Sequence, residues 1–262
     1  MATRSELLSA RSQLYEVIRA SEEWDKSYKK DRATFKRLVE NESSLNTAVS
    51  EYLYGLSQRA VSYVDWSKLP IIAADRGPVL NNDDPAWRQE MARLTALILD
   101  LIIEQAQTGA DAGEAFYAAL SGLDLRSAIL TYARNHTAQL VSQVTETSRD
   151  LIRESVRQSI AMGEDAPTAI ERLTKVINNP VRAEMIAQTE SVNAYQGGLA
   201  TYATATGAQT KTWDGLVGAC KICEPVIGQT INIDEQFVLA NGDQVDHPAG
   251  HPRCRCSLIY NY

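Results

Sequence analysis

The sequence predicts a mainly α-helical protein with a small C-terminal α+β domain: long helices, then a short-stranded sheet and a cysteine/histidine cluster. Three observations predict this. Apolar residues recur at steps of three and four through the first two thirds of the chain, the residue pattern changes after Gly207, and all four cysteines lie in the last 43 of 262 residues. Helical periodicity indicates amphipathic helices, whereas short β-branched runs between turns indicate strands.

The first 60 residues predict two helices, over residues 4–31 and 33–60, because their apolar positions follow helical spacing. Residues 66–85 differ, with three prolines and a run of asparagine and aspartate. Such a composition is typical of a loop or hinge. We therefore expect these two helices to be separated by a loop from the rest of the helical region.

Asp84 and Pro85 predict the start of the next helix. An aspartate can cap the free N–H groups of a first turn, and proline is favoured at the first helical position. We expect this helix to run through Ile103. A shorter helix is predicted at about residues 112–120, closed by Gly122.

Residues 124–162 predict the longest helix. Its apolar seam follows alternating steps of three and four through Ala133, Thr137, Leu140, Val144, Thr147 and Leu151. Such a seam suits helix-on-helix packing, within one chain or between subunits of a coiled coil. Two polar threonines in the seam favour a helix of a bundle within one chain.

Two further helices are predicted before the change in character. Gly163 ends the long helix, and Asp165 caps a helix over residues 168–178. Asn179 caps the next helix, which we expect over residues 180–206. Each of these caps offers a side-chain oxygen to the first turn, so the helix starts are the firmest boundaries.

The last part of the chain predicts a helix packed on a small sheet. The pair Gly197 and Gly198 lies inside the last predicted helix, where glycine is unfavourable, and therefore indicates close backbone packing or a bend. Short strands are predicted at residues 210–213, 229–233 and 256–260.

We divide the chain by these patterns into three regions. Residues 1–122 form a helical N-terminal region, residues 123–180 the long helix with a connecting helix, and residues 181–262 a C-terminal domain.

Composition argues against some classes of function. Apolar residues make up 44% and charged residues 23%, as in ordinary globular proteins, and the net charge is −7. One run of basic residues could indicate a nucleic-acid-binding surface, but acidic residues interrupt it, so a solvated helix face is favoured. The run comprises Lys26, Lys29, Lys30, Arg32, Lys36 and Arg37. No secretory signal and no apolar run long enough for a bilayer is found, so we expect no membrane partner and synthesis in a cytosol.

The cysteines and histidines at the C-terminal end predict a metal site. Cys220 and Cys223 have the two-residue spacing that turns both sulfurs toward one point. Cys254 and Cys256 lie on one face if their segment is extended, and His251 can reach that side. Five candidate ligands therefore converge where zinc needs four.

Other readings of the cluster stay open at this point. The thiols could be buried and free, or paired as disulfides in an oxidising medium. A structural zinc ion is favoured, with Cys220 and Cys223 and two of the other three residues as ligands. His247 is expected at a solvent-exposed loop tip.

No phosphate-binding glycine loop, metalloprotease helix or serine nucleophile motif is present, so the sequence predicts no enzyme.

Residues 125–262 resemble the Mu F-like phage head-morphogenesis proteins. The likeness is carried by a helix motif and by the cluster, through Arg182, Ile186, Thr189, Glu190, Ala194, Gly197, Lys211, Trp213, Cys220, Cys223, Gly228, Gln229, His251, Cys254, Cys256 and Ser257. The chain departs from the family pattern at Gln188, often an arginine, and at Gln196, often an asparagine. These departures affect the expected interface between helix and sheet.

The resemblance implies a minor head protein of a tailed phage that is located in the virion interior near the portal, and in the host cytoplasm during assembly. It implies a role in head morphogenesis or in DNA packaging and delivery. The implied partners are the portal protein first, then the major capsid or scaffolding protein and packaged DNA, with residues 1–122 as the adaptor. The alternative function is a zinc-supported nuclease or nucleic-acid-binding module, with His247 or His251 as a base.

Overall fold

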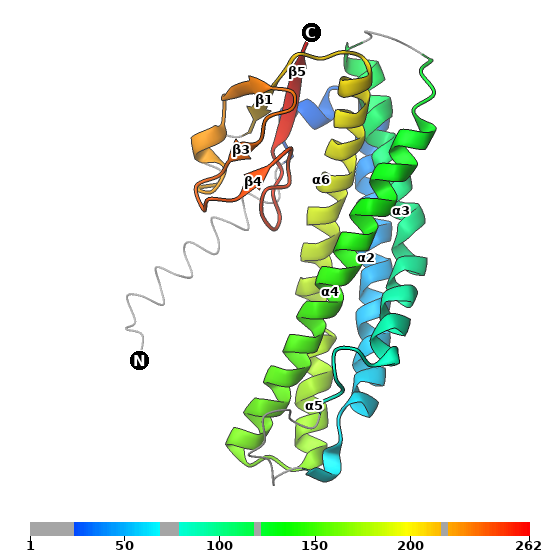
Figure 1. Cartoon of the computed structure of the whole chain (residues 1–262), viewed down its shortest axis with the longest axis vertical. Coiled ribbons are helices and arrows are strands. Elements are labelled where there is room, and N and C mark those ends of the chain that lie inside the picture. Colours follow the sequence, from blue (N-terminus) through cyan, green and yellow to red (C-terminus); the bar gives the residue numbers. More distant parts are fainter. Residues whose placement is uncertain (1–23, 69–78, 118–121, 216–219) are drawn as a thin grey trace. The chain divides into compact units, whose positions relative to one another are not determined.

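The computed structural model describes residues 24–68, 79–117, 122–215 and 220–262 (Figure 1). The helices are α2 (Arg32–Ala60), α3 (Pro85–Tyr117), α4 (Arg126–Met162), α5 (Ala166–Ile177) and α6 (Pro180–Ala205). Single 3-10 turns are η1 (Lys26–Lys29), η2 (Val61–Tyr63), η3 (Trp66–Lys68) and η4 (Glu224–Val226). The strands are β1 (Thr210–Asp214), β2 (Thr230–Asn232), β3 (Phe237–Val238), β4 (Gln244–Val245) and β5 (Ser257–Asn261). The predicted fold class is confirmed.

The predicted capping residues start the helices. Asp84 accepts a hydrogen bond from Ala86 N–H at 2.9 Å, and Asp165 accepts one from Thr168 N–H at 3.0 Å. Asn179 Oδ1 likewise accepts from Val181 N–H at 3.0 Å. These bonds satisfy N–H groups that have no partner inside the helix, so local sequence alone determines where the helices begin.

The predicted break after Ile103 is wrong. Helix α3 continues to Tyr117 and includes residues 112–117 of the segment predicted as a separate helix at 112–120, whose residues 118–120 lie outside the described residues. Gly109 lies within it, and a Cβ atom there would be 1.8 Å from the carbonyl oxygen of Tyr195. This close helix packing offsets the low helix propensity of glycine.

The paired glycines of α6 have the predicted packing role. A Cβ atom on Gly198 would lie 1.8 Å from the carbonyl oxygen of Ala106 in α3, and one on Gly197 would lie 1.9 Å from the Tyr132 ring of α4. Real Cβ atoms cannot approach so closely. The close approach of these helices therefore requires glycine at both positions.

The predicted start of the first helical region is partly wrong. A helix was predicted over residues 4–31, but among the described residues the chain has only the short turn η1 before α2 begins at Arg32. The remainder of that prediction, residues 1–23, lies outside the described residues. Helix α2 matches the prediction for residues 33–60.

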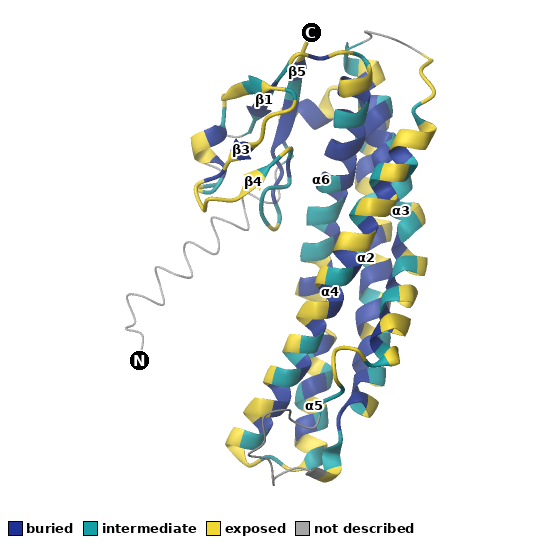
Figure 2. Ribbon diagram, in the orientation of Figure 1, coloured by how far each residue is buried: buried dark blue, intermediate teal, exposed yellow. Residues whose placement is uncertain are grey.

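The seam of α4 follows its predicted positions as far as Val144 and then shifts. Thr147 is exposed and Leu151 is half-buried, while Ser148, Ile152 and Ser159 are buried instead. A straight α-helix has 3.6 residues per turn, so a buried stripe drifts relative to an exact seven-residue repeat. Figure 2 shows this as one buried stripe and one exposed stripe along the helix.

The contacts divide the chain into two compact units. The first unit comprises Met1–Glu42, Ile102–Ala133 and Gln188–Tyr262, and the second comprises Ser43–Leu101 and Arg134–Ala187. In the second unit, Glu90 is fully buried and bonds Arg59, Arg93 and Tyr63. No described helix has an apolar stretch long enough to cross a membrane.

The first unit contains the strands. β1 pairs antiparallel with both β2 and β5, which gives the order β2-β1-β5, and β3 pairs with β4 as a separate hairpin. Trp213 of β1 pairs with Leu258 of β5, and both are buried in one cluster with Tyr195 and Leu199 of α6. The helix before the strands thus packs on the sheet, as expected.

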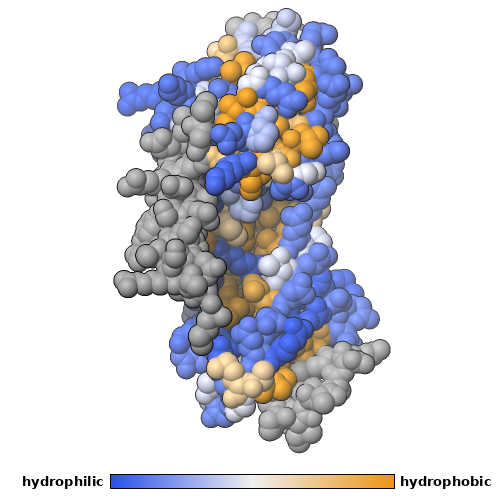
Figure 3. Space-filling model, turned by 90° about the vertical axis from the view of Figure 1, so that its left-hand side faces the viewer, coloured by the Kyte–Doolittle hydropathy of each residue, from blue (hydrophilic) through white to orange (hydrophobic). Residues whose placement is uncertain are grey.

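The hairpin of β3 and β4 was not predicted. Residues 239–243 connect these two strands, each of which has two residues. In the space-filling view, apolar residues remain visible among polar ones in the upper part of the face shown (Figure 3). The part of the chain after α6 has few strand residues, and such a region gains stability from a further cross-link.

Candidate metal centre

Cys220 and Cys223 lie on a tight turn between β1 and β2. The N–H of Ile222 donates to Cys220 Sγ at 3.3 Å, and the N–H of Glu224 donates to the Cys220 carbonyl at 2.9 Å. The turn continues into η4, whose Val226 N–H donates to the Cys223 carbonyl at 3.0 Å. These backbone bonds hold both sulfurs on the inner side of the turn, as the spacing predicts.

His251 lies at the start of a second turn, which leads to Cys254. The N–H of Cys254 donates to the His251 carbonyl at 3.2 Å, and Arg253 has a positive φ of 62°. His251 Nδ1 lies 2.8 Å from the carbonyl oxygen of Pro252. A proton on Nδ1 would therefore be held by this carbonyl, which leaves Nε2 free to act as a ligand.

Helix α6 positions this second turn through two residues that sequence reasoning missed. Arg253 N–H donates to Thr189 Oγ1 at 3.0 Å, and Ala249 N–H donates to Asn193 Oδ1 at 2.7 Å. Thr189 and Asn193 are four residues apart, so they lie on the same helix face. The signal was present in the sequence, since Thr189 belongs to the helix motif that carries the family resemblance.

Cys256 lies directly before β5 and is buried. A Cβ atom on Gly215 would lie 2.9 Å from Cys256 Sγ, so the chain after β1 passes close to this sulfur. Cys254 is also buried, with 1% exposure. The sulfurs of Cys254 and Cys256 lie within 4.8 Å of each other, as expected for side chains on one face.

The five candidate ligands lie in two overlapping groups. The ligand atoms of Cys220, Cys223 and His251 lie within 4.8 Å of one another, as do those of Cys223, Cys254 and Cys256. Cys220 Sγ is 3.1 Å from His251 Nε2, and Cys223 Sγ is 3.9 Å from Cys254 Sγ. Cys223 therefore joins the two groups, and all four cysteines are free thiols.

Electrostatics favour negative charge on two of the sulfurs. Hydrogen bonding to Cys223, and then to His251, lowers the pKa of Cys220 to about 4 against the opposing effect of burial. Hydrogen bonds from Cys223 and Cys256 likewise lower the pKa of Cys254. Burial lowers the pKa of His251. The nearby Cys220 and Cys254 outweigh this effect and raise the pKa to about 10.

The same interactions keep the other two thiols protonated. Hydrogen bonds to Cys220 and Cys254 raise the pKa of Cys223, because it is the donor in each. The hydrogen bond to Cys223 is the largest single influence on Cys256 and lowers its pKa. Cys254 and burial act in the opposite direction and together outweigh it, so the pKa of Cys256 is raised. The cluster thus concentrates sulfur charge that a divalent cation could neutralise.

The donor set fits a zinc ion. Zinc binds thiolate sulfur at about 2.3 Å, so two ligands of a tetrahedral site lie about 3.8 Å apart. The separation of 3.9 Å between the sulfurs of Cys223 and Cys254 agrees with this distance. Thiolate and imidazole donors favour zinc over the oxygen-preferring ions magnesium and calcium. These residues could therefore hold a metal.

The two other histidines lie outside the cluster. His247 was expected to be solvent-exposed but is half-buried, with its ring centroid 6.2 Å from that of Tyr132. The contact of His247 with Tyr132 of α4 could not be predicted from the sequence of the loop that carries His247. His136 is half-buried on α4.

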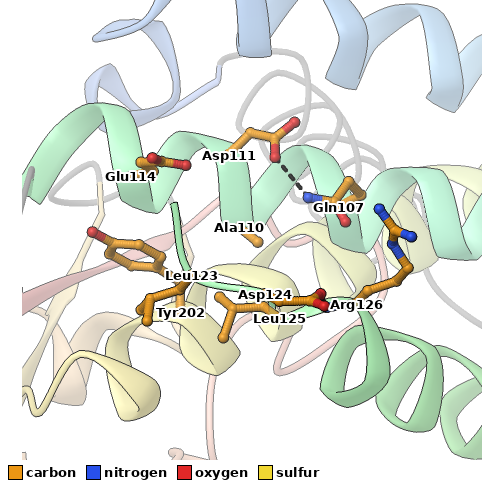
Figure 4. A pocket seen from close by; sticks show the side chains of 9 residues that line it. All are labelled: Gln107, Ala110, Asp111, Glu114, Leu123, Asp124, Leu125, Arg126 and Tyr202. Carbon is orange, nitrogen blue, oxygen red and sulfur yellow. Dashed lines mark hydrogen bonds between the residues drawn. The ribbon is translucent and has the colours of Figure 1, made fainter. Parts of the chain in front are cut away.

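A separate cavity of about 130 Å³ lies in the first unit, beside α3 (Figure 4). It is lined by Gln107, Ala110, Asp111, Glu114, Leu123, Asp124, Leu125, Arg126 and Tyr202. Its acidic side chains are partly engaged already, since Asp111 bonds Gln107 at 2.7 Å and Arg37 at 2.6 Å. The cavity contains none of the five candidate ligands.

Comparison with known families supports the resemblance seen in the sequence. Residues 150–259 match the family model described as Phage Mu protein F like protein. The matched region includes α5, α6, the sheet and all five candidate ligands, and it leaves out α2, α3 and the first part of α4. Searches of curated proteins and of solved structures found no significant match.

Proposed function

We propose that this chain is a structural minor head protein of a tailed phage, associated with the portal, since its residues 150–259 match the family model described as Phage Mu protein F like protein. The observation that carries the proposal is that one matched region contains both the helix motif and the complete cysteine/histidine cluster. A fold alone would not support a function, so the proposal rests on this match.

In this proposal the helical region of residues 1–122 contacts the portal or capsid, and residues 181–262 form a C-terminal domain. The long helix and connecting helix of residues 123–180 join the two. Further partners are the major capsid or scaffolding protein and packaged DNA. The acidic balance of the chain, with a net charge of −7, favours protein contacts over a tight grip on DNA.

We assign the metal a structural role and propose zinc. We propose Cys220, Cys223, His251 and Cys254 as the ligands, because Cys220 Sγ lies 3.1 Å from His251 Nε2 and Cys223 Sγ lies 3.9 Å from Cys254 Sγ. Cys256 then lies beside the ligands, where the chain at Gly215 passes close to its sulfur. The ion would cross-link the turn after β1 to the turn before β5, where few strand residues hold the chain.

Particle fractionation tests the proposed function. Affinity capture of the full chain from cells assembling particles should recover portal subunits, and the chain should sediment with DNA-filled heads. Particles assembled with His251→Asn should show defective heads or DNA delivery, while His247→Asn serves as the matched control outside the cluster. Finding the chain only in the free protein fraction would contradict the proposal.

A nuclease assay tests the rival function. His251 has one ring nitrogen 3.1 Å from Cys220 Sγ and the other 2.8 Å from a carbonyl, so neither nitrogen is placed to activate water. We expect purified protein to leave plasmid DNA intact with added magnesium, manganese or zinc. Metal-dependent cleavage that His247→Asn or His251→Asn abolishes would replace the structural proposal by the enzymatic one.

A further inference from the structure

Residues 24–42 form a strap that packs on the metal-site region. The strap consists of η1 with its flanking residues and the first part of α2, and it belongs to the same compact unit as residues 188–262. Tyr28 and Leu38 of the strap lie in one buried cluster with Cys223, Cys254 and Cys256. The strap is outside the part of the chain that matches the family.

Alternation along residues 254–257 explains how one segment serves both the cluster and the strap. Cys254 and Cys256 direct their sulfurs to the cluster. Arg255 and Ser257, which alternate with them, contact the strap instead. In an extended chain successive side chains point to opposite sides, so this segment is a two-faced element.

Arg255 makes the principal contact with the strap. Its guanidinium donates two hydrogen bonds to the carboxylate of Glu42, at 2.6 and 2.8 Å, and its Cζ lies 3.7 Å from the ring centroid of Trp24. Arg255 is only 7% exposed. A bidentate pair combined with stacking on an aromatic ring is specific to arginine and fixes the orientation of this side chain.

The backbone of the same segment is also bound by the strap. The hydroxyl of Tyr28 donates to the carbonyl of Cys256 at 2.6 Å and accepts a hydrogen bond from Gln196 Nε2 at 2.9 Å. Ser27 Oγ hydrogen-bonds Ser257 Oγ, and Asp25 Oδ1 accepts from Ser27 Oγ at 2.6 Å. All of these groups are buried, so loss of one partner leaves an unsatisfied polar group.

From this two-faced segment we infer that the strap is a latch coupled to the metal site: metal binding on one face of residues 254–257 holds the conformation that docks residues 24–42 on the other. The inference rests on the proposed metal site. Coupling between two binding events is reciprocal, so docking of the strap must strengthen metal binding by the same factor by which metal strengthens docking.

Limited trypsin digestion of the full chain measures the first half of this coupling. Lys26, Lys29 and Lys30 are exposed on the strap, and Lys221 lies between the two cysteines of the first turn. We expect cleavage at the strap lysines to be about tenfold slower in zinc-loaded than in chelator-treated protein. Lys221 reports metal binding itself, and Arg157 of α4, in the other unit, is the control whose cleavage stays constant.

Zinc affinity of latch variants measures the other half. Tyr28→Phe removes only the hydroxyl that binds the Cys256 carbonyl, and Glu42→Gln removes the charge that faces Arg255. Each should raise the zinc dissociation constant about tenfold, as for other residues that orient ligands, in competition with a chromogenic chelator. Tyr54→Phe and Glu51→Gln, at exposed positions of α2, are the matched controls and should leave it unchanged.

The outcomes separate the latch from the metal site. Zinc binding with protection of Lys221, but with unchanged strap cleavage and unchanged affinity in both latch variants, overturns the latch and keeps the metal site. Absence of zinc binding in the wild-type chain overturns the metal site and the latch with it. Circular dichroism should show that Tyr28→Phe, which preserves the shape of the side chain, remains folded.

Discussion

Among single residues, the proposed choice of four ligands from the five candidates rests on short contacts. Cys254 Sγ is 3.9 Å from Cys223 Sγ, whereas Cys256 Sγ packs against Gly215. His251 Nε2 is 3.1 Å from Cys220 Sγ, whereas His247 lies beside Tyr132. The sequence could not make this selection because all five candidates have suitable side chains at suitable spacings.

Metal analysis of two matched pairs tests the selection. Cys254→Ser and His251→Asn each remove a ligand, so the zinc content should fall from about one per chain to near zero. Cys256→Ser should retain the ion and weaken binding by roughly 10- to 100-fold, as expected of a residue around the ligands, and His247→Asn should retain it fully. Loss of zinc in Cys256→Ser with retention in His251→Asn would reverse the assignment.

A buried carboxylate provides a second prediction for a single residue. Glu90 has no exposed side-chain area and bonds Arg59 at 2.6 and 2.7 Å. Glu90→Gln leaves the shape intact but removes the charge that compensates this arginine, so the free energy of unfolding should fall by about 3 kcal/mol. Urea denaturation measures the change. Glu51→Gln, at an exposed position, is the control and should alter it by less than about 0.5 kcal/mol.

Among the helices, glycines determine how closely two backbones can approach. Gly109 of α3 and Gly198 of α6 each lie against a carbonyl oxygen of the other helix, so contact is made from both sides. This packing explains why α3 continues through a segment where the sequence predicts a break. Helix propensity is a weak preference, and tertiary contacts of this kind override it.

Alanine substitutions test the role of this helix contact. At Gly198 a Cβ atom would meet the Ala106 carbonyl at 1.8 Å, and backbone cannot move aside easily, so Gly198→Ala should destabilise the protein by about 3 kcal/mol. At Gly55 the nearest atom is the end of the Arg59 side chain, at 2.7 Å. Gly55→Ala should therefore destabilise the protein less than Gly198→Ala, because the end of a side chain can shift more easily than a backbone carbonyl. Equal effects of the two substitutions on thermal unfolding would contradict the packing argument.

For the whole molecule, the carboxylates with lowered pKa values determine how acid acts on stability. Burial opposes ionisation of Glu90, but hydrogen bonds from Arg59 and Tyr63 outweigh it and lower its pKa. The hydrogen bond from Arg172 lowers the pKa of Glu164 to about 2. In the unfolded chain the pKa of glutamate is about 4.3. Below that pH the unfolded state therefore binds more protons than the folded state does.

Stability should therefore be fully present above about pH 4.3 and be lost as the pH falls through the lowered pKa of Glu90. The difference in unfolding free energy between wild type and Glu90→Gln should be constant at pH 5 to 7 and should narrow toward pH 3. Both proteins have the same cluster, so loss of metal in acid affects them equally. A difference that stays constant down to pH 3 would show that the ionised state of Glu90 does not contribute.

The sequence by itself determined the features that depend on neighbouring residues. The helix starts at Pro85, Ala166 and Pro180 follow from the caps before them, because a capping side chain bonds N–H groups only two or three residues away. The turn at Cys220 and Cys223 can likewise be predicted, because its hydrogen bonds join residues only a few positions apart. The fold class could be predicted because it rests on such local patterns.

Only the tertiary structure decided the features that depend on distant segments. The Arg255–Glu42 pair joins residues 213 positions apart, and nothing in the neighbourhood of either residue indicates the other. The continuation of α3, the shifted seam of α4 and the hairpin of β3 and β4 are of the same kind. Each is stabilised by burial against chain that is remote in sequence, and local propensity is too weak to determine such contacts.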